Sequence, residues 1–404
     1  MRPRYWHIVL AVFFLGWVFM YADRTVLSPV LATIGSEWRL STSQLGLISS
    51  LFFLAYAALQ LPTGWLADRF GRKLLLVPGY LLFGITTLLS AFAPSYGIFL
   101  LLATLTGLGE GTYYPTQFSL SSEVIPRRFR SFGSAIINSG QAVGISLGFI
   151  ASGFVAFTLN AGWRTSFAVL GVATVLAGLV IALLIRERPA ASDAPAEVAA
   201  PNTSTEEAAT RLLSRDLVLA YIAGFCSLYG FFVIITWLPY YLQTARHEPS
   251  SLTGVISSLV PWASVPGALL ISYLSDRVHA RRAFALLMMP VAALALLFIP
   301  LSQSSAALFG ALVLYGLVGK LALDPILVAY VADRVPRTAY SRAYAILNFS
   351  GMLSSILAPY LTGYLANRFG SLDTGFYLAT ALLLVGALCM AFTRREKILA
   401  AGAS

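Results

Sequence analysis

Long apolar stretches recur along the whole chain, separated by short polar segments. Each is about 20 residues long or longer, the length that an α-helix needs to cross a bilayer. The pattern therefore predicts an all-α membrane protein with twelve transmembrane helices. We place them near residues 6–28, 43–67, 74–93, 97–122, 131–158, 164–185, 216–242, 251–275, 283–301, 305–332, 340–366 and 374–393.

One segment interrupts this pattern in the middle of the chain. Residues 187–214 are rich in Pro, Ala, Ser, Thr and acidic residues, a composition typical of a flexible linker that builds no core. We therefore expect three parts. Residues 1–186 form an N-terminal six-helix bundle, residues 187–214 a cytoplasmic linker, and residues 215–404 a C-terminal six-helix bundle.

The two predicted bundles repeat one another at a spacing of about 210 residues, which is the signature of a duplicated transporter fold. Pro29 matches Pro239, and the pair Asp68-Arg69 matches Asp276-Arg277. Pro115, Pro126 and Ser139-Gly140 match Pro325, Pro336 and Ser350-Gly351. Five matches in the same order indicate duplication, and we expect two pseudo-symmetric bundles around a central cavity.

Composition excludes a soluble protein. Hydrophobic residues make up 58% of the chain, charged residues only 11%, and the mean hydropathy is +0.78, whereas a soluble domain carries about 25% charged residues. The first apolar run is too long for the core of a signal peptide and no cleavage site ends it, so we expect it to be retained.

The basic residues predict the orientation of the chain. Most of the 27 Lys and Arg fall on the side that also holds both termini and the linker. Because cytoplasmic loops carry an excess of Lys and Arg, this side is predicted to be cytoplasmic, in a multi-pass protein of the cell inner (plasma) membrane. The net charge of +10 then reports topology and does not indicate nucleic-acid binding.

The segment GWLADRFGRKLLL, which follows the second predicted helix, resembles the loop 2–3 signature of the major facilitator superfamily. This resemblance implies the major facilitator fold and a monomer. It also implies a cluster on this loop that latches the two bundles in one conformation. The implied latch residues are Gly64, Asp68, Arg69, Gly71, Arg72 and Lys73, with Asp276 and Arg277 in the second copy.

Two further motifs narrow the resemblance. The sequences YADR (residues 21–24) and GLGEGTYYP (residues 107–115) are similar to those of the anion:cation symporter group, which transports sugar acids, sialic acid and glutamate. Spinster-type transporters carry similar residues, so the subfamily stays open. The chain departs from the symporter pattern at Ala103, where that group often has an Arg two turns before Glu110.

Ionisable residues within the predicted helices are the candidates for function, because a charge at membrane depth is costly unless it is paired or hydrated. Asp23 and Arg24 are expected in the outer third of helix 1. Glu110 corresponds to Lys320 across the repeat, so the two are expected to face each other across the central cavity, with Lys320 near the middle of its helix. The alternative is a structural ion pair between Lys320 and Asp324, four residues apart on one helix.

We hypothesise that Arg24, with Lys320 as a second cation, binds the anionic group of a substrate, because a guanidinium matches the geometry of a carboxylate. Asp23, Glu110 and Asp324 would then carry the coupling proton. Other polar and aromatic residues on cavity-facing helices are candidates for orienting the substrate. They are Tyr21, Tyr56, Gln60, Tyr113, Tyr114, Asn138, Gln141, Trp237, Tyr240 and Asn348.

These residues favour proton-coupled symport of a small organic anion, such as a carboxylate or a sugar acid. A proton-coupled exporter of lipophilic, lipid-like or cationic compounds is the alternative, and a membrane sensor or scaffold is a third class. No catalytic motif, metal-ligand spacing or phosphate-binding loop is present in the sequence, so we expect neither an enzyme nor a cofactor. The substrate, the direction of transport, the oligomeric state and the choice between proton and sodium stay open.

Overall fold

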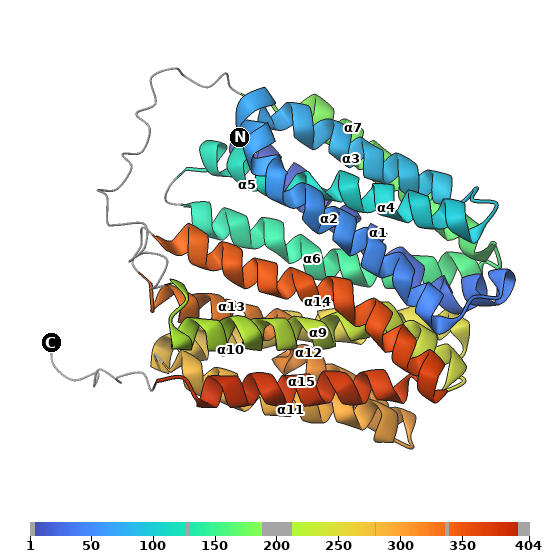
Figure 1. Cartoon of the computed structure of the whole chain (residues 1–404). Coiled ribbons are helices and arrows are strands. Elements are labelled where there is room, and N and C mark those ends of the chain that lie inside the picture. The colour runs from blue at the N-terminus through green and yellow to red at the C-terminus, as the bar shows by residue number, and fades with distance from the viewer. Residues whose placement is uncertain (1–4, 127–128, 188–211, 279, 336–338, 395–404) are drawn as a thin grey trace, which may run out of the picture. The chain divides into compact units, whose positions relative to one another are not determined.

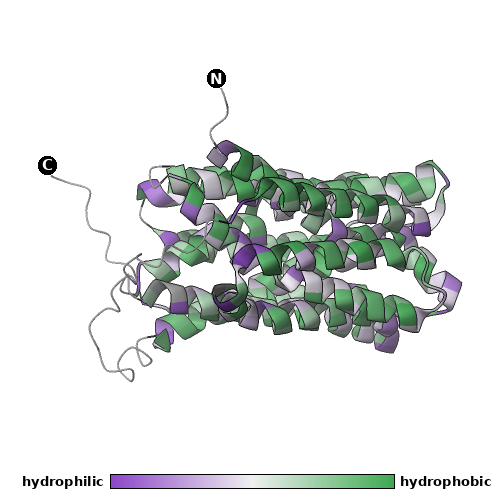
Figure 2. Ribbon diagram, turned by 90° about the horizontal axis from the view of Figure 1, so that it is seen from above, coloured by the Kyte–Doolittle hydropathy of each residue, from purple (hydrophilic) through white to green (hydrophobic). Residues whose placement is uncertain are grey.

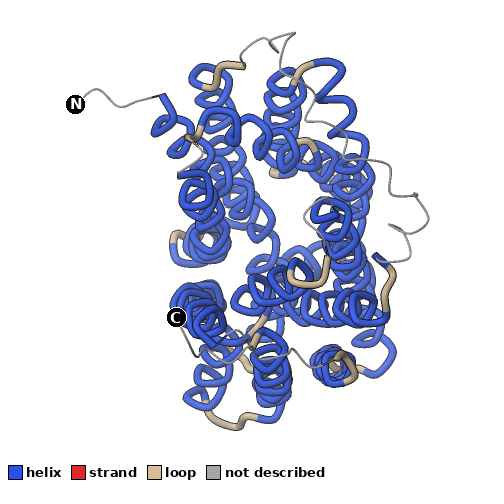
Figure 3. The backbone as a smooth tube through the Cα atoms, turned by 90° about the vertical axis from the view of Figure 1, so that its left-hand side faces the viewer, coloured by secondary structure: helices blue, strands red, loops and turns tan. Residues whose placement is uncertain are grey.

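The computed structural model describes residues 5–126, 129–187, 212–278, 280–335 and 339–394. Helices account for almost all of these residues, and none of them lies in a β-strand (Figure 3). Figure 2 shows apolar residues along the lengths of the helices and many of the polar ones near their ends. The predicted all-α membrane fold is confirmed.

The N-terminal half contributes six predicted spans, one of them in two pieces (Figure 1). Their helices are α1 (Tyr5–Trp38), α2 (Thr42–Phe70), α3 (Arg72–Ser90), α4 (Tyr96–Gly111), α5 (Tyr113–Val124), α6 (Arg130–Gly153), which continues as a short π-helix, and α7 (Gly162–Leu184). Eleven helices in the described part of the chain are long and apolar enough to cross a membrane. The predicted fourth span is not among them because α4 and α5 are each too short alone.

The C-terminal half follows the same order. Its helices are α9 (Arg215–Thr244), α10 (Ser250–Val278), α11 (Arg281–Leu301), α12 (Ser305–Val318), α13 (Lys320–Ala332), α14 (Tyr340–Phe369) and α15 (Asp373–Ala391). Several helices contain proline in their interior, as at Pro29 and Pro359. Such prolines are tolerated in membrane helices because neighbouring groups can satisfy the freed backbone.

The prediction for the first helix was too short. Helix α1 spans 34 residues, or roughly 51 Å at 1.5 Å per residue, and Pro29 lies inside it. Asp23 and Arg24 consequently lie about halfway along α1 and not in its outer third.

Two predicted helices are interrupted, and a buried charge flanks each break. The predicted fourth helix breaks at Thr112, directly after Glu110 and Gly111. The tenth breaks at Gly319, whose backbone is extended (φ −76°, ψ −163°), so Lys320 begins α13 and does not lie in mid-helix as predicted. Thr112 itself keeps right-handed helical angles (φ −80°, ψ −21°), so of these two breaks only that at Gly319 takes the backbone out of helical geometry.

The described chain forms two compact units. The first comprises residues 1–192, 235–258 and 359–370, and the second comprises the rest. In the first unit α1 packs along α6, and α3 packs along α7; in the second, α11 packs along α15 (Figure 1). The predicted division at residues 187–214 stays a prediction, because residues 188–211 lie outside the described part of the chain.

Small residues allow α1 and α6 to pack closely. Gly140, Gly144 and Gly148 of α6 lie against backbone carbonyl groups of Phe14, Val18 and Ala22. A methyl group at any of these positions would press on the α1 backbone. This packing fixes the central part of α1, which carries the candidate site.

Candidate functional site

The centre of the first unit holds a buried ion pair between α1 and α4. The Nε of Arg24 donates to Oε2 of Glu110 at 2.6 Å, and the two side chains are only 6% and 0% exposed. Because a charge at this depth is costly without a partner, the pair accounts for the presence of both residues. The predicted opposition of Glu110 and Lys320 stays a prediction, because the two residues belong to different compact units.

Aromatic rings surround the guanidinium of Arg24. Its Cζ atom lies 4.6 Å from the ring centre of Tyr56, 4.8 Å from that of Tyr21 and 5.8 Å from that of Phe53. A cation within about 6 Å of an aromatic face is attracted by the ring quadrupole. The rings therefore hold the guanidinium in place on the sides that Glu110 does not cover.

The pair retains unused hydrogen-bonding capacity. The Nη2 of Arg24 and Oε1 of Glu110 are buried without hydrogen-bond partners. A guanidinium has five N–H donors in a planar fork, so Arg24 can bind a second acceptor beside Glu110. An incoming carboxylate or sulfonate is the chemical group that would satisfy it best.

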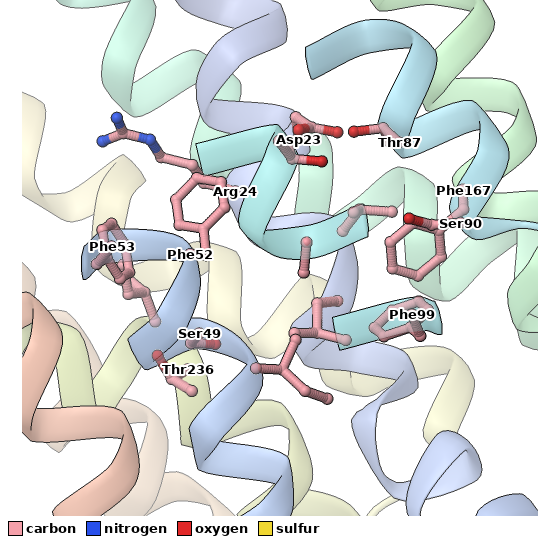
Figure 4. A pocket seen from close by; sticks show the side chains of 16 residues that line it. Asp23, Arg24, Ser49, Phe52, Phe53, Thr87, Ser90, Phe99, Phe167 and Thr236 are labelled. Carbon is pink, nitrogen blue, oxygen red and sulfur yellow. The ribbon is translucent and has the colours of Figure 1, made fainter. Parts of the chain in front are cut away.

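Asp23 lies beside the pair but faces another direction. It is 6% exposed, and it lines a small cavity together with Thr87, Ser90 and Phe167 of neighbouring helices. In Figure 4 its carboxyl group points toward Thr87, whereas the guanidinium of Arg24 points away from Thr87. These adjacent side chains of α1 thus point in different directions, although both line the cavity.

The second unit contains its own ion pair. The Nζ of Lys320 lies 3.0 Å from Oδ2 of Asp324, one turn further along α13, and 5.2 Å from the ring centre of Phe231. The side chain of Lys320 is 10% exposed and that of Asp324 is 43% exposed. The alternative weighed from the sequence, an i,i+4 pair, is the arrangement observed.

The other candidate residues are dispersed. Gln60 donates to the hydroxyl of Tyr56 at 3.2 Å, which ties it to the Arg24 cluster. Tyr113 and Trp237 are fully buried and donate to the carbonyl groups of Phe13 and Pro359, so neither lines the cavity beside Asp23. The rest are Tyr114 against Trp17, Tyr240 against Trp237, exposed Asn138 and Asn348, and half-buried Gln141.

The loop that resembles the family signature is bound by residues that sequence reasoning missed. Gly71 has φ 99°, a conformation that favours glycine, and turns the chain between α2 and α3. Arg72 pairs with Glu123 at the end of α5. Glu187 accepts from the backbone N–H groups of Arg72 (2.7 Å) and Lys73 (3.0 Å), which places a negative charge at the N-terminus of α3.

The structure shows fewer interactions for the remaining latch residues. Arg69 lies over the rings of Trp65 and Phe70, a Cβ at Gly64 would meet no described atom within 4 Å, and the side chain of Asp68 is outside the described residues. The second copy has an equivalent ion pair: Arg281, at the start of α11, contacts Asp276 (2.9 Å) and Asp333 (2.7 Å). Glu123 and Asp333 follow the 210-residue spacing, a signal by which the sequence could have revealed both.

Buried charges at membrane depth, helix breaks beside them and a duplicated bundle together define a membrane transporter. The chain belongs to the Major Facilitator Superfamily, which it matches over residues 13–317 and 220–401. The resemblance seen in the sequence is confirmed. As a member of this family, the protein is a transporter and not an enzyme.

Its relatives carry organic acids. A probable sulfoacetate transporter of Cupriavidus necator is 31% identical over 96% of this chain and 93% of its own. The gentisate transporter of Corynebacterium glutamicum is 26% identical over 96% and 88%. A probable galactarate/D-glucarate transporter of Bacillus subtilis is 27% identical over 96% and 90%.

The fold also matches solved structures. The crystal structure of a bacterial homolog of the human lysosomal transporter Spinster, in an inward-facing and occupied conformation, superposes with a TM-score of 0.79. The match covers 97% of both chains at 18% sequence identity. At this identity the likeness shows the fold alone.

Proposed function

We propose that this protein is a proton-coupled symporter of a small organic anion that works by alternating access. The observation that carries the proposal is the buried Arg24–Glu110 pair, in which the cation keeps an unused N–H donor. The organic acids named for the relatives support an anionic substrate. On the basis of its loop charges, we place this chain in the plasma membrane with both termini cytoplasmic.

The coupling follows from competition for Arg24. While Glu110 is ionised, it occupies the guanidinium that the substrate anion needs. When Glu110 takes up a proton its charge is lost, and Arg24 is released to the substrate carboxylate or sulfonate. Proton and anion therefore bind together, which is the requirement for symport, because each without the other leaves an unbalanced buried charge.

Lys320 and Asp324 form the corresponding pair of the C-terminal half. We assign Lys320 as the second cation for the substrate and Asp324 as the group that neutralises it when no substrate is bound. We assign the conformational latch to the loop signature, with Arg72–Glu123 and Arg281–Asp333 as its ion pairs. The protein is expected to work as a monomer.

The test is proton movement in proteoliposomes that contain a pH-sensitive dye. Sulfoacetate, gentisate, D-glucarate, phosphate and the lipophilic cation tetraphenylphosphonium are added in turn to wild type and to Arg24→Ala. The matched control is Arg164→Ala, which removes an exposed arginine from another pair, Arg164–Glu37. We expect internal acidification with one of the organic anions in wild type and in Arg164→Ala, and none in Arg24→Ala.

A response to tetraphenylphosphonium alone would overturn the proposal in favour of an exporter of lipophilic cations. Anion uptake without proton movement would retain the anion substrate and overturn proton coupling. Uptake that persists in Arg24→Ala with an unchanged apparent affinity would remove Arg24 from the binding site.

A further inference from the structure

The cavity beside Asp23 is small and lies within the first compact unit. Residues from six helices line it, including Ser49 of α2, Thr106 of α4 and Thr236 of α9 (Figure 4). Its volume is about 50 Å³. Because one water needs roughly 10–15 Å³ on this measure, the cavity has room for a few water molecules, and it is far too small for a sugar acid.

Two polar atoms at this cavity have no hydrogen-bond partner. They are Oδ1 of Asp23 and Oγ1 of Thr87, from side chains that are 6% and 2% exposed. An unsatisfied buried polar group costs about 1–3 kcal/mol, so the neighbouring pair calls for a shared partner. A water that bridges them would satisfy both, as ordered waters commonly do for neighbouring polar groups.

The adjacent threonine provides a contrast. The hydroxyl of Thr86 bonds to that of Thr106 at 2.8 Å, and Ser90 donates to the carbonyl group of Thr86 at 2.9 Å. These hydroxyls line or flank the cavity and are already satisfied within the protein. Thr87 is the member of this threonine pair whose hydroxyl is left for Asp23 and water.

Asp23 interacts electrostatically with both members of the substrate pair. On its own helix it adjoins Arg24, which is engaged by Glu110 of α4. From α3 the phenol of Tyr80 approaches, but its hydroxyl donates to the carbonyl group of Gly16 at 2.9 Å. The lining residues from α2, α7 and α9 are uncharged. No residue lining the cavity, all of them within the described chain, offers Asp23 a cation other than Arg24.

We propose that Thr87 is a positioning residue for proton transfer to Asp23, and that a proton reaches this carboxylate through water in the cavity that both residues line. This protonation is additional to that of Glu110. In the step itself a hydronium ion donates one proton to Oδ1 of Asp23: its O–H bond breaks, an O–H bond forms on Asp23, and a water molecule is left. The Thr87 hydroxyl holds that water, and the reverse step returns the proton. This inference rests on the proposed proton coupling.

The experiment reads the proton on Asp23 directly, without a substrate. Infrared spectra of the purified full-length protein in lipid are recorded across a pH series, and the carboxylic-acid band of Asp23 is assigned by its loss in Asp23→Asn. Thr87→Val replaces the hydroxyl by a methyl group of similar size, and Thr87→Ser restores the hydroxyl. The matched control is Thr174→Val, because Thr174 of α7 is also buried with an unpaired hydroxyl but does not line the cavity.

We expect Thr87→Val to shift the band and to move its midpoint by about one pH unit, a tenfold change in proton affinity, as the loss of one hydrogen bond to a charged group implies. Thr87→Ser should return both to the wild-type values, and Thr174→Val should leave them unchanged. An unaltered band in Thr87→Val would overturn the inference. So would a wild-type protein in which no Asp23 band titrates, or in which sodium abolishes the Asp23 band at constant pH.

The proteoliposome assay separates the two proposals. If wild type shows no proton movement with any anion, the proposed symport fails whatever the infrared band does. If wild type acidifies the vesicles and Thr87→Val gives the wild-type band and pH profile, the symport stands and the role of Thr87 fails.

Discussion

Removal of Arg24 should destabilise the protein strongly, because its partner cannot reach water. The change is Arg24→Ala, which removes the guanidinium from a site where Glu110 is 0% exposed. The carboxylate then remains buried next to Asp23, another acidic residue. Nothing else among the contacts described for Glu110 replaces the lost cation.

The magnitude follows from burial. Breaking a buried ion pair by removing one partner costs about 3–5 kcal/mol, mainly because an uncompensated charge is left behind. The exposed pair Arg164–Glu37, whose side chains are 41% and 38% exposed, should contribute only about 0–1 kcal/mol. Glu37 also keeps a hydrogen bond from Trp163 at 2.7 Å. Arg164→Ala therefore leaves no buried charge without a partner, and it is the matched control.

The assay is unfolding in mixed micelles by increasing SDS, followed by tryptophan fluorescence, for wild type, Arg24→Ala, Glu110→Gln and the double variant. Arg24→Ala should show the largest loss in free energy of unfolding. The double variant should recover roughly 2 kcal/mol relative to Arg24→Ala, since the glutamine carries no charge.

The reasoning would be refuted by additivity. If the double variant loses the sum of the two single losses, the side chains do not interact as an ion pair in the membrane. A loss in Arg24→Ala no greater than in Arg164→Ala would show that Glu110 is solvated or protonated without its partner.

Three further predictions concern packing, the second ion pair and the α1–α9 contact. Gly148→Ala would press a methyl group on Ala22 and Thr25 of α1 and should reduce the yield of folded protein several-fold by size-exclusion chromatography, whereas Gly310→Ala, with open space around it, should not. Lys320→Ala should abolish anion uptake yet lower the free energy of unfolding in SDS by about 1 kcal/mol or less, because Asp324 is 43% exposed and remains hydrated. A loss of stability comparable to that of Arg24→Ala would contradict this. Ser28→Ala combined with Gln243→Leu removes two bonds to backbone carbonyl groups, to Ile235 and Pro29 at 2.6 Å each. At about 1 kcal/mol per bond, this should increase thiol labelling of a cysteine placed at Ser49 roughly thirtyfold in a background without Cys226 and Cys389, with unchanged labelling as the contrary result.

The sequence predicted the fold well because membrane helices obey a simple constraint. Apolar length and the 210-residue repeat follow directly from the bilayer and from duplication. The breaks at Thr112 and Gly319 escaped prediction, because glycine is common within membrane helices and does not by itself mark an interruption. The predicted end of the first helix near residue 28 fell short, since α1 continues through Pro29 to Trp38.

The sequence predicted which charged residues belong to the candidate site, but not that Arg24 pairs with Glu110. Asp23, Arg24, Glu110 and Lys320 stand out in the sequence as charges within apolar runs. Which acid pairs with which base depends on how α1 and α4 pack and on the rotation of each helix, and neither is visible in a single sequence. The contribution of Thr87 was missed for a related reason: a threonine in a membrane helix usually bonds to its own backbone.

The helix breaks leave a short separate helix in each half of the protein, α5 in the first and α13 in the second. Helix α5 runs about 18 Å from Thr112 to Val124. Near its end Glu123 pairs with Arg72, the first residue of α3. Helix α13 runs from the Gly319 break to Asp333, which holds the first residue of α11, Arg281. A tilt of α5 that begins beside Glu110, or of α13 that begins beside Lys320, would therefore cause a larger displacement at the far end of that helix. We therefore expect that neutralising Glu110 weakens the Arg72–Glu123 pair, and that neutralising Lys320 weakens the Arg281–Asp333 pair, each almost 20 Å away.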